Sequence, residues 1–402
     1  MDITDPHTAA QRRPLRFGAN YVPSQGWFYS WLDFDPAAAE ADLRDLAELG
    51  MDHVRIFPIW PWIQPGRGQL RRAAVDDVRH LVRIAARLGL DVSVDLVQGH
   101  LSSFDFVPSW ALTWHRASIF EDRRVRDGLR AYVTTMVDEL AGETNVFAFT
   151  LGNEVNNLWP ANPTTIDAST AWAAELVEVV RAHARPGQQV VHSLFDDAFY
   201  ATDHPFGAQD VVRLGDVSSV HSWVFNGTSA IDGPLGAATT SHAAYLAELA
   251  VACGGTDRPV WLQEVGAPLP DIPAEHTAEF VPRTVAAVAA LPQLLGVTWW
   301  CSHDIDRRQL DFPEREYDLG LYTVDHRAKP AAHALRAAIA DARLTDPAAE
   351  QRPVVVAPVD IMQRPQDRGS LAPGSEFHRA WVAAGRQPDG SVIPARIRLP
   401  RN

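Results

Sequence analysis

Val146–Asn157 reads VFAFTLGNEVNN, and the interpretation of the rest of the chain starts from this stretch. It opens with a run of apolar, aromatic and β-branched residues, which is typical of a fully buried strand. Gly152 ends the run, and Asn153 and Glu154 follow as the chain leaves the strand. Burying a carboxylate costs free energy unless another group pairs with it, and packing gives no reason for one here. Glu154 is therefore the first candidate for chemistry.

The composition limits the possible partners and cofactors. The chain has 402 residues, of which 46% are hydrophobic and 21% charged, as in a soluble globular protein with a substantial core. A net charge of −14 argues against nucleic acid or an anionic membrane as a partner. The single lysine, Lys329, argues against Schiff-base and pyridoxal-phosphate chemistry. We expect neither a cofactor nor a bound metal, and the sequence does not indicate an oligomer.

Cysteine usage and hydropathy predict the compartment. Cys253 and Cys301 are too few for a disulfide framework and lack zinc-site spacing. The N-terminal residues have no apolar core of a signal peptide, and no later run is long enough to cross a membrane. A reducing cytoplasm is the expected location.

Strand-like runs alternate with amphipathic helical segments along most of the chain. Asp35, Pro36 and Gly50, for example, are typical of the cap, first position and end of a helix. The expected strands are Arg16–Tyr21, His53–Pro58, Asp91–Val97, Val146–Leu151, Gln189–Leu194, Val217–His221, Pro259–Glu264 and Gly296–Trp300. Eight strands, mostly with helices between them, predict an α/β fold, a (β/α)8 TIM barrel over residues 1–343.

The sequence also bears on an alternative fold and on the C-terminal residues. A doubly wound sheet is the alternative fold, but no G-x-G-x-x-G motif follows the first strand. The Pro- and Arg-rich residues 344–402 break the alternation. We expect them to form a short C-terminal extension wrapped on the barrel or a small β appendage.

Polar residues gather where the expected strands end. In a (β/α)8 barrel, chemistry takes place at the carboxyl ends of the strands. Glu154 ends the fourth strand and Glu264 the seventh, so their carboxylates should face each other across the barrel mouth. Such a pair suits glycosidic cleavage, in which one carboxyl protonates the leaving oxygen and the other attacks or activates water. A separation of about 5–5.5 Å would give retention, and roughly 6.5–9.5 Å inversion.

The neighbouring residues fit this division of labour. Arg55, from the second strand, could hold one carboxylate ionised. Asn153 offers an amide to a sugar hydroxyl, and His221 and Trp223 could orient a carboxylate and the sugar. The other predicted substrate contacts are Asn20, His100, Trp110, Trp300, His303 and Asp304. Which of Trp299 and Trp300 faces the sugar depends on the register of the last strand.

The motifs LGNEVNN and WLQEVGAP resemble the acid/base and nucleophile motifs of clan A glycoside hydrolases. Family 5 of that clan has the same ordered set over about residues 15–340, here Arg55, His100, Asn153, Glu154, His221, Glu264 and Trp300. The resemblance implies that Glu154 is the acid/base and Glu264 the nucleophile. It also implies a retaining reaction through a glycosyl-enzyme intermediate.

A narrower resemblance concerns the substrate. The stretches GANYVPSQGWFYSWLDFD, HVRIFPIWPWIQP and QGHLSSFDF are similar to the bacterial subfamily 18 of family 5. Its members act as β-mannosidases, so the resemblance implies exo action on short oligosaccharides such as Man-β-1,4-GlcNAc. Family 5 usually has Tyr two residues after the histidine of the sixth strand, and Trp223 stands there. The hydrogen bond of that Tyr to the nucleophile is therefore missing or comes from elsewhere.

Three alternatives remain open from the sequence. The enzyme could be a β-glucosidase or β-galactosidase of the same clan, because glucose and galactose differ from mannose by the orientation of single hydroxyl groups. It could also be an endo-β-mannanase, because the sequence does not fix exo or endo action. A metal-dependent sugar isomerase would use Glu154, Glu264, His221 and Asp304 as ligands. A non-catalytic carbohydrate-binding barrel would be expected to lack one of the two carboxylates, and both are present.

Overall fold

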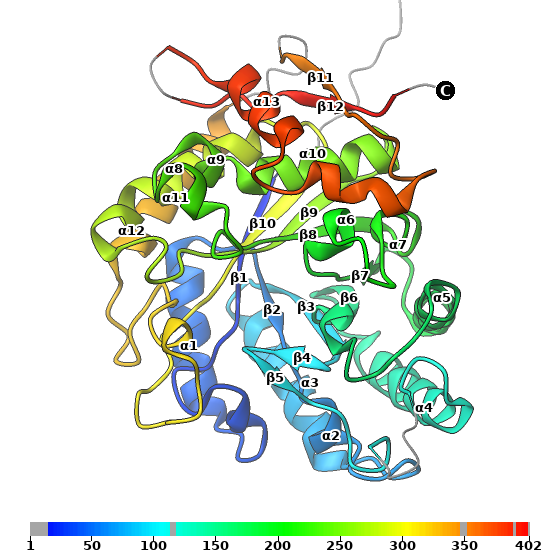
Figure 1. The fold of residues 1–402 in the computed structure, drawn as a ribbon. Coiled ribbons are helices and arrows are strands. Elements are labelled where there is room, and N and C mark those ends of the chain that lie inside the picture. The colour runs from blue at the N-terminus through cyan, green and yellow to red at the C-terminus, as the bar shows by residue number, and fades with distance from the viewer. Residues whose placement is uncertain (1–14, 113–117, 346–351, 389–390, 401–402) are drawn as a thin grey trace, which may run out of the picture.

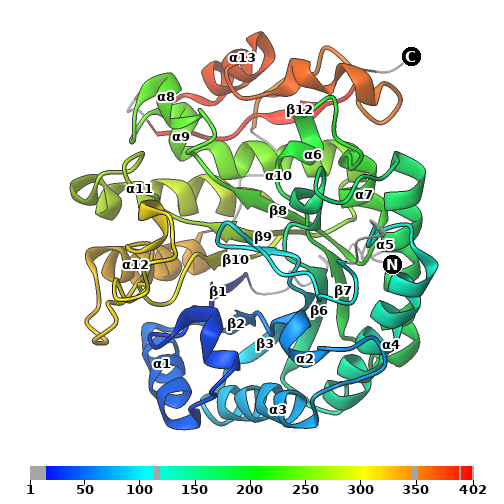
Figure 2. The ribbon, with the colours of Figure 1, turned by 60° about the horizontal axis from the view of Figure 1, so that its bottom comes forward.

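A closed barrel of eight parallel strands forms the centre of the computed structural model (Figures 1 and 2). The structure describes residues 15–112, 118–345, 352–388 and 391–400. Residues 1–14, on which the prediction about a signal peptide rests, lie outside this part. The barrel strands are β1 (Arg16–Asn20), β2 (His53–Ile56), β3 (Asp91–Val97), β6 (Val146–Gly152), β7 (Gln189–His192), β8 (Val217–Ser222), β9 (Val260–Val265) and β10 (Leu294–Trp299). They follow one another in chain order around the barrel, with β10 closing on β1, which confirms the predicted (β/α)8 fold.

Helices surround the barrel on the outside, as Figure 2 shows. The longer ones are α1 (Pro36–Leu49), α3 (Arg72–Arg87), α4 (Arg123–Leu140), α5 (Ile166–His183), α10 (His242–Gly254), α11 (Ala274–Ala289) and α12 (Pro330–Leu344). The short ones are η1 (Trp27–Trp31), α2 (Trp60–Ile63), η2 (Val155–Leu158), α6 (Asp197–Tyr200), α7 (Ala208–Arg213), α8 (Ser229–Asp232), α9 (Ala237–Thr240) and η3 (Glu314–Glu316). A two-stranded hairpin, β4 (His100–Leu101) with β5 (Phe104–Asp105), follows β3. In the part of the chain that the structure describes, no helix is both long and apolar enough to cross a membrane.

Helix α1 shows how local chemistry sets the element boundaries. The Asp35 carboxylate accepts hydrogen bonds from the backbone N–H groups of Ala37 and Ala38, which would otherwise have no partner in the first turn. Gly50 ends the helix with φ of 93°, a left-handed conformation that only glycine adopts without strain. These are the cap and end expected from the sequence.

The interior of the barrel is polar as well as apolar. Trp261 Nε1 and His53 Nε2 both lie 2.8 Å from Thr298 Oγ1. One layer closer to the carboxyl ends, Gln263 Nε2 donates to Thr150 Oγ1 at 2.9 Å. Buried polar groups need such partners because water is absent. These hydrogen bonds hold Thr298, Gln263 and Thr150 in place inside the barrel, beneath the residues at the carboxyl ends of the strands.

The C-terminal segment packs over α10, at the top of Figure 1. It contains β11 (Val354–Val356), η4 (Pro365–Leu371), α13 (Glu376–Gly385) and β12 (Arg396–Arg398), and β11 pairs in parallel with β12. The Trp381 ring lies 5.0 Å from that of Tyr245 on α10. Arg352 and Glu248 of α10 form a buried ion pair. The segment thus contains a two-stranded sheet and packs on a barrel helix, and the division of the chain at residue 344 stays a prediction.

The ion pair between Glu248 and Arg352 should be a strong tether of this segment. Both side chains are 2% exposed, so Glu248→Ala would leave a buried guanidinium without its carboxylate. We expect the free energy of unfolding to fall by about 3–5 kcal/mol, as measured by urea denaturation. Glu279→Ala, which removes an exposed ion pair with Arg283 on α11, is the control and should change stability little. Equal unfolding midpoints for the two variants would contradict the tether.

Candidate active site

A cavity of about 170 Å³ opens at the carboxyl ends of the barrel strands. Its lining includes six of the residues predicted from the sequence, namely His100, Asn153, Glu154, Trp223, Glu264 and Trp300. Strand ends and the loops after them supply all six, as expected for a (β/α)8 barrel. We therefore identify this cavity as the candidate active site.

The end of β6 delivers Glu154 into the cavity. A side chain at Gly152 would place its Cβ 2.3 Å from the backbone oxygen of Val97, so the close approach of β6 and β3 requires glycine. Two residues later, Glu154 has φ of 43° and ψ of 48°, a left-handed conformation that is uncommon for a non-glycine residue. Strained backbone of this kind is concentrated at functional sites. The turn into η2 thus brings the carboxylate back over the barrel mouth, where it is 7% exposed.

Arg55 is the centre of the polar network beneath the cavity, and its side chain is fully buried. Nε and NH2 donate to the two carboxylate oxygens of Asp95 on β3, at 2.8 and 2.6 Å. NH1 donates to Glu264 Oε1 at 2.6 Å and to Asn20 Oδ1 at 3.2 Å, and NH2 donates to Asn153 Oδ1 at 2.7 Å. Arg55 therefore holds two residues of the cavity wall, Glu264 and Asn153, from below, and Asn20 contacts Arg55.

Glu264 is surrounded by hydrogen-bond donors. Besides Arg55 on Oε1, Trp223 Nε1 donates to Oε2 at 3.1 Å, and His221 Nδ1 lies 3.3 Å from Oε2. Burial by itself would raise the pKa of Glu264, but the charge of His221 and the hydrogen bonds from His221 and Arg55 outweigh it and hold the pKa well below its usual value. The carboxylate of Glu264 is thus kept ionised. The sequence left open whether a hydrogen bond reaches Glu264 from this position, and the indole of Trp223 supplies one.

His221 bridges the two carboxylates. Its Nδ1 lies 2.7 Å from Glu154 Oε1, closer than to Glu264. Its Nε2 lies 2.9 Å from the hydroxyl of Ser193, which can accept a hydrogen bond, and 3.2 Å from Gln263 Oε1, which is turned toward His221 because Gln263 Nε2 donates to Thr150. Both ring nitrogens therefore face acceptors, an arrangement that suits the imidazolium. Burial lowers the pKa of His221, but the charge of Glu264 and the hydrogen bonds to both carboxylates raise it to about 9.

Glu154 has the opposite electrostatic environment to Glu264. Burial and then the charge of Glu264 raise the pKa of Glu154, and the hydrogen bond with His221 opposes this only in part. Asn157 Nδ2 donates to Glu154 Oε2 at 2.9 Å and fixes the second oxygen. One carboxyl that favours the proton thus faces one that does not, which is the pairing that acid–base chemistry uses.

The register of β10 decides which indole lines the cavity. Trp300 lies in the cavity wall, with its ring 6.1 Å from that of Trp223 and nearly perpendicular to it. Trp299 lines a different cavity, beside Lys329 and Asp304, because successive residues of a strand point to opposite faces. Trp300 therefore offers the aromatic face.

Asn20, Arg55 and His221, also predicted as substrate contacts, lie beneath the cavity and do not line it. Three further predicted contacts lie elsewhere, and here the prediction needs correction. Trp110 Nε1 donates to the backbone oxygen of Gln64 at 3.0 Å, and its ring packs against that of Trp60. His303 Nε2 lies 3.1 Å from Asp45 of α1, and Asp304 accepts a hydrogen bond from Lys329 Nζ at 2.7 Å. None of these three residues lines the cavity. Proximity in sequence to the end of β10 was misleading for His303 and Asp304 because the chain turns away after Trp300, whereas Trp110 belongs to the long loop after β3.

The sequence analysis missed several residues of the site, among them Asn157, which donates to Glu154. Asp95 interrupts the apolar run of β3, and Gln263 directly precedes Glu264, so both could have been recognised as polar residues in buried strands. Glu316, on η3, lies in the cavity wall although no sequence pattern distinguishes it. Burial is the main cause that raises the pKa of Glu316 to about 7, and the charges of Glu264 and Glu154 add to it. The site therefore has a third carboxyl group.

The geometry does not favour the metal-dependent isomerase. Glu154, His221 and Glu264 each place one ligand atom within 4.8 Å of the others. However, the guanidinium of Arg55 donates to Glu264, and a cation so close would repel a metal ion. The fourth expected ligand, Asp304, pairs with Lys329 instead.

Comparison with solved structures reveals close relatives. The chain is similar to a glycoside hydrolase family 5 subfamily 18 protein from Streptomyces cattleya in complex with GlcNAc, with 44% identity over 96% of this chain and 94% of that chain and a TM-score of 0.89. A variant of the Streptomyces protein was crystallised with Man-β-1,4-GlcNAc. A subfamily 18 protein from Bifidobacterium longum subsp. longum has 41% identity over 96% of this chain and 92% of that chain and a TM-score of 0.90.

Other comparisons add little to these. An exo-β-1,4-mannosidase from Opitutaceae bacterium strain TAV5 shares 22% identity over 97% of this chain and 70% of that chain, with a TM-score of 0.74, and supports the fold alone. No protein-family profile matches the chain, and no curated protein does. With more than 40% identity over nearly the whole of both chains, the Streptomyces and Bifidobacterium structures show the family. The chain therefore belongs to subfamily 18 of glycoside hydrolase family 5 and is a glycoside hydrolase.

Proposed function

We propose that this protein is a retaining β-mannosidase that removes a terminal mannose from short oligosaccharides such as Man-β-1,4-GlcNAc. One observation carries the proposal: an ionised Glu264 and a proton-favouring Glu154 face each other, with carboxylate oxygens within 4.8 Å. Inverting enzymes keep their carboxyl groups roughly 6.5–9.5 Å apart to admit a water molecule. The short spacing supports double displacement.

In the first step, Glu264 attacks the anomeric carbon and the glycosidic bond breaks. Glu154 gives its proton to the departing oxygen, so that the aglycone leaves as an alcohol. In the second step, Glu154 takes a proton from water as the water oxygen attacks the same carbon. The bond to Glu264 breaks as the bond to the water oxygen forms, so Glu264 is released as a carboxylate and the sugar leaves with its original configuration.

The electrostatics suit Glu154 to both steps. The charge of Glu264 is one of the causes that raise the pKa of Glu154. That charge disappears when Glu264 becomes a glycosyl ester, so the pKa of Glu154 should fall at the moment when it has to act as a base. The same residue can therefore be an acid before the intermediate and a base after it.

Mannose and exo action are supported by the relatives and by the size of the cavity. The Streptomyces and Bifidobacterium proteins were crystallised as variants with Man-β-1,4-GlcNAc. A cavity of about 170 Å³ is small beside the roughly 300–1,000 Å³ of sites for drug-sized ligands. A panel of aryl β-mannosides, β-glucosides and β-galactosides, followed by Man-β-1,4-GlcNAc and β-mannan, tests this against the endo-mannanase, glucosidase and galactosidase alternatives. Location in the cytoplasm stays a prediction from the sequence.

Glu264→Gln should abolish the first step. The amide is isosteric with the carboxylate but is a very weak nucleophile, so we expect kcat/KM for an aryl β-mannoside to fall by at least about 10³-fold. Steady-state release of the phenol from the aryl β-mannoside measures this value of kcat/KM. Glu279→Gln, an exposed change on α11, is the control. Near-wild-type hydrolysis by Glu264→Gln would refute its assignment as nucleophile.

Glu154→Ala should separate the two steps. Without its acid, the enzyme should lose hydrolysis of Man-β-1,4-GlcNAc but still form the glycosyl-enzyme from a dinitrophenyl β-mannoside, whose leaving group needs no proton. Added azide should then accelerate turnover and yield β-mannosyl azide, identified by NMR. An α-linked azide product would contradict retention, and an absence of rescue would contradict the role of Glu154 as the base.

Trp223→Phe should shift the acid limb of the pH profile. The indole donor favours the ionised form of Glu264, so its removal should raise the pKa of Glu264 and move the acid limb of kcat/KM to higher pH. The loss of one hydrogen bond to a charged group predicts a fall in kcat/KM of about 10- to 100-fold. Trp110→Phe, outside the cavity, is the matched control and should leave the profile in place. Identical profiles for the two variants would rule out the indole contact.

A further inference from the structure

Four ionisable side chains converge beside α1, outside the sugar cavity. Asp42 and Asp45 lie three residues apart on α1 and so share one face of the helix. His303 follows β10, and His326 comes from the loop before α12. We propose that this cluster binds one divalent transition-metal ion, with zinc the best match for two imidazoles and a carboxylate.

The distances fit such a site. Asp42 Oδ1 lies 3.7 Å from His303 Nε2 and 3.9 Å from His326 Nε2. Ligand atoms of all three residues lie within 4.8 Å of one another. Zinc holds nitrogen and oxygen ligands at about 2.0–2.2 Å, so tetrahedral ligands are roughly 3.4 Å apart. Inward shifts of a few tenths of an ångström would bring Asp42 Oδ1 to that distance from each of the two histidines.

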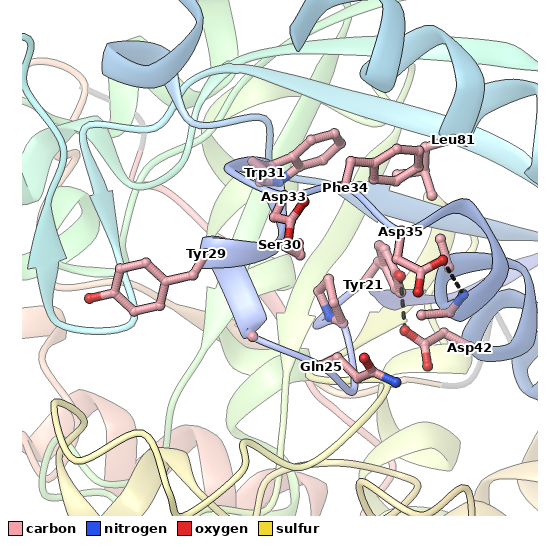
Figure 3. Close-up of a pocket in the computed structure, with 14 residues that line it drawn as sticks. Tyr21, Gln25, Tyr29, Ser30, Trp31, Asp33, Phe34, Asp35, Asp42 and Leu81 are labelled. Carbon is pink, nitrogen blue, oxygen red and sulfur yellow. Dashed lines mark hydrogen bonds between the residues drawn. The ribbon is translucent and has the colours of Figure 1, made fainter. Parts of the chain in front are cut away.

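Asp42 has a carboxylate oxygen that needs a partner. The residue is 1% exposed, and its Oδ2 accepts hydrogen bonds from Tyr21 Oη at 2.9 Å and from the Ser24 backbone N–H at 3.1 Å. Figure 3 shows the contact with Tyr21, at the edge of a cavity separate from the sugar site. Oδ1, which is aimed at the two histidines, has no hydrogen-bond partner. A buried anionic oxygen without a donor is costly, and a cation would satisfy it.

Asp45 is placed to orient one of the imidazoles. Its Oδ2 lies 2.7 Å from His326 Nδ1 and 3.1 Å from His303 Nε2. A hydrogen bond from His326 Nδ1–H to Asp45 leaves Nε2 of His326 free for the ion, the arrangement found in many zinc sites. His303 would bind through Nε2 in place of its present contact with Asp45, with its proton on Nδ1, which has no hydrogen-bond partner in the structure. The side chains of His326 and Asp45 are 35% and 20% exposed, so the ion can enter from solvent.

The site would join the loop between β10 and α12 to the first helix of the barrel. The Tyr322 hydroxyl, in the same loop, already donates to the backbone oxygen of Asp45 at 3.0 Å. The loop also carries Glu316 into the wall of the sugar cavity. A bound ion would therefore hold the ends of the segment that presents Glu316, without itself contacting the sugar.

Zinc titration of tag-free, chelator-treated protein tests the proposal. Isothermal calorimetry should show one ion per chain with a Kd in the micromolar range or below, and the Tm should rise with zinc. His326→Gln and Asp42→Asn should weaken binding by at least about 10- to 100-fold and remove the zinc-dependent rise in Tm. His333→Gln, an exposed histidine on α12, is the matched control and should bind as the wild type does.

Each other outcome would overturn the proposal. An absence of stoichiometric zinc binding by the wild type would show that the four side chains form only an ion-pair network. Binding that survives in His326→Gln but is lost in Glu264→Gln would place the ion in the sugar cavity instead. Because His326 is partly exposed, the His326→Gln variant should fold. If this variant hydrolyses an aryl β-mannoside without zinc as the wild type does, it is folded, and its loss of zinc binding can be assigned to the missing imidazole.

Discussion

The rest of the active site depends on the burial of the Arg55 guanidinium in the barrel. A charge without water must have all its hydrogen bonds made, and the five N–H groups of Arg55 find them on Asp95, Asn20, Asn153 and Glu264. Two of these partners determine the site. Glu264 is held directly, and Asn153 fixes the residue next to Glu154. One buried cation therefore positions the nucleophile candidate and the end of the strand that carries the acid candidate.

The two carboxyl groups are chemically alike, and their surroundings make them different. Glu264 receives Arg55, Trp223 and His221, all of which stabilise negative charge. Glu154 shares His221 but otherwise has a single amide donor, and it lies beside the charge of Glu264. The difference in pKa follows from the number of donors and from mutual repulsion. Because repulsion is part of the cause, a change of charge at Glu264 is felt at Glu154.

The strands were predictable from the sequence, whereas the loops were not. A parallel strand covered on both faces must be an apolar run, so all eight runs were recognised to within a few residues. The polar residues that end such runs stand out for the same reason, which is why Arg55, Asn153, Glu154, His221 and Glu264 were found. A loop residue has no periodicity to place it. Trp110, His303 and Asp304 were assigned to the sugar site and lie outside it, while Glu316 was overlooked.

By itself, the sequence determined the closed barrel and the pair of glutamates. A buried strand is recognisable as an apolar run, and the polar residue that ends the run marks the end of the strand. Only the tertiary structure decided how these residues work. It showed that Trp223 replaces a hydroxyl donor, that Trp300 rather than Trp299 faces the cavity, and that Asp42 and His303 meet across the molecule. Each of these depends on a contact between residues far apart in the chain. Hydrogen-bond geometry and ion pairing act through space over a few ångströms, and sequence distance carries no information about them.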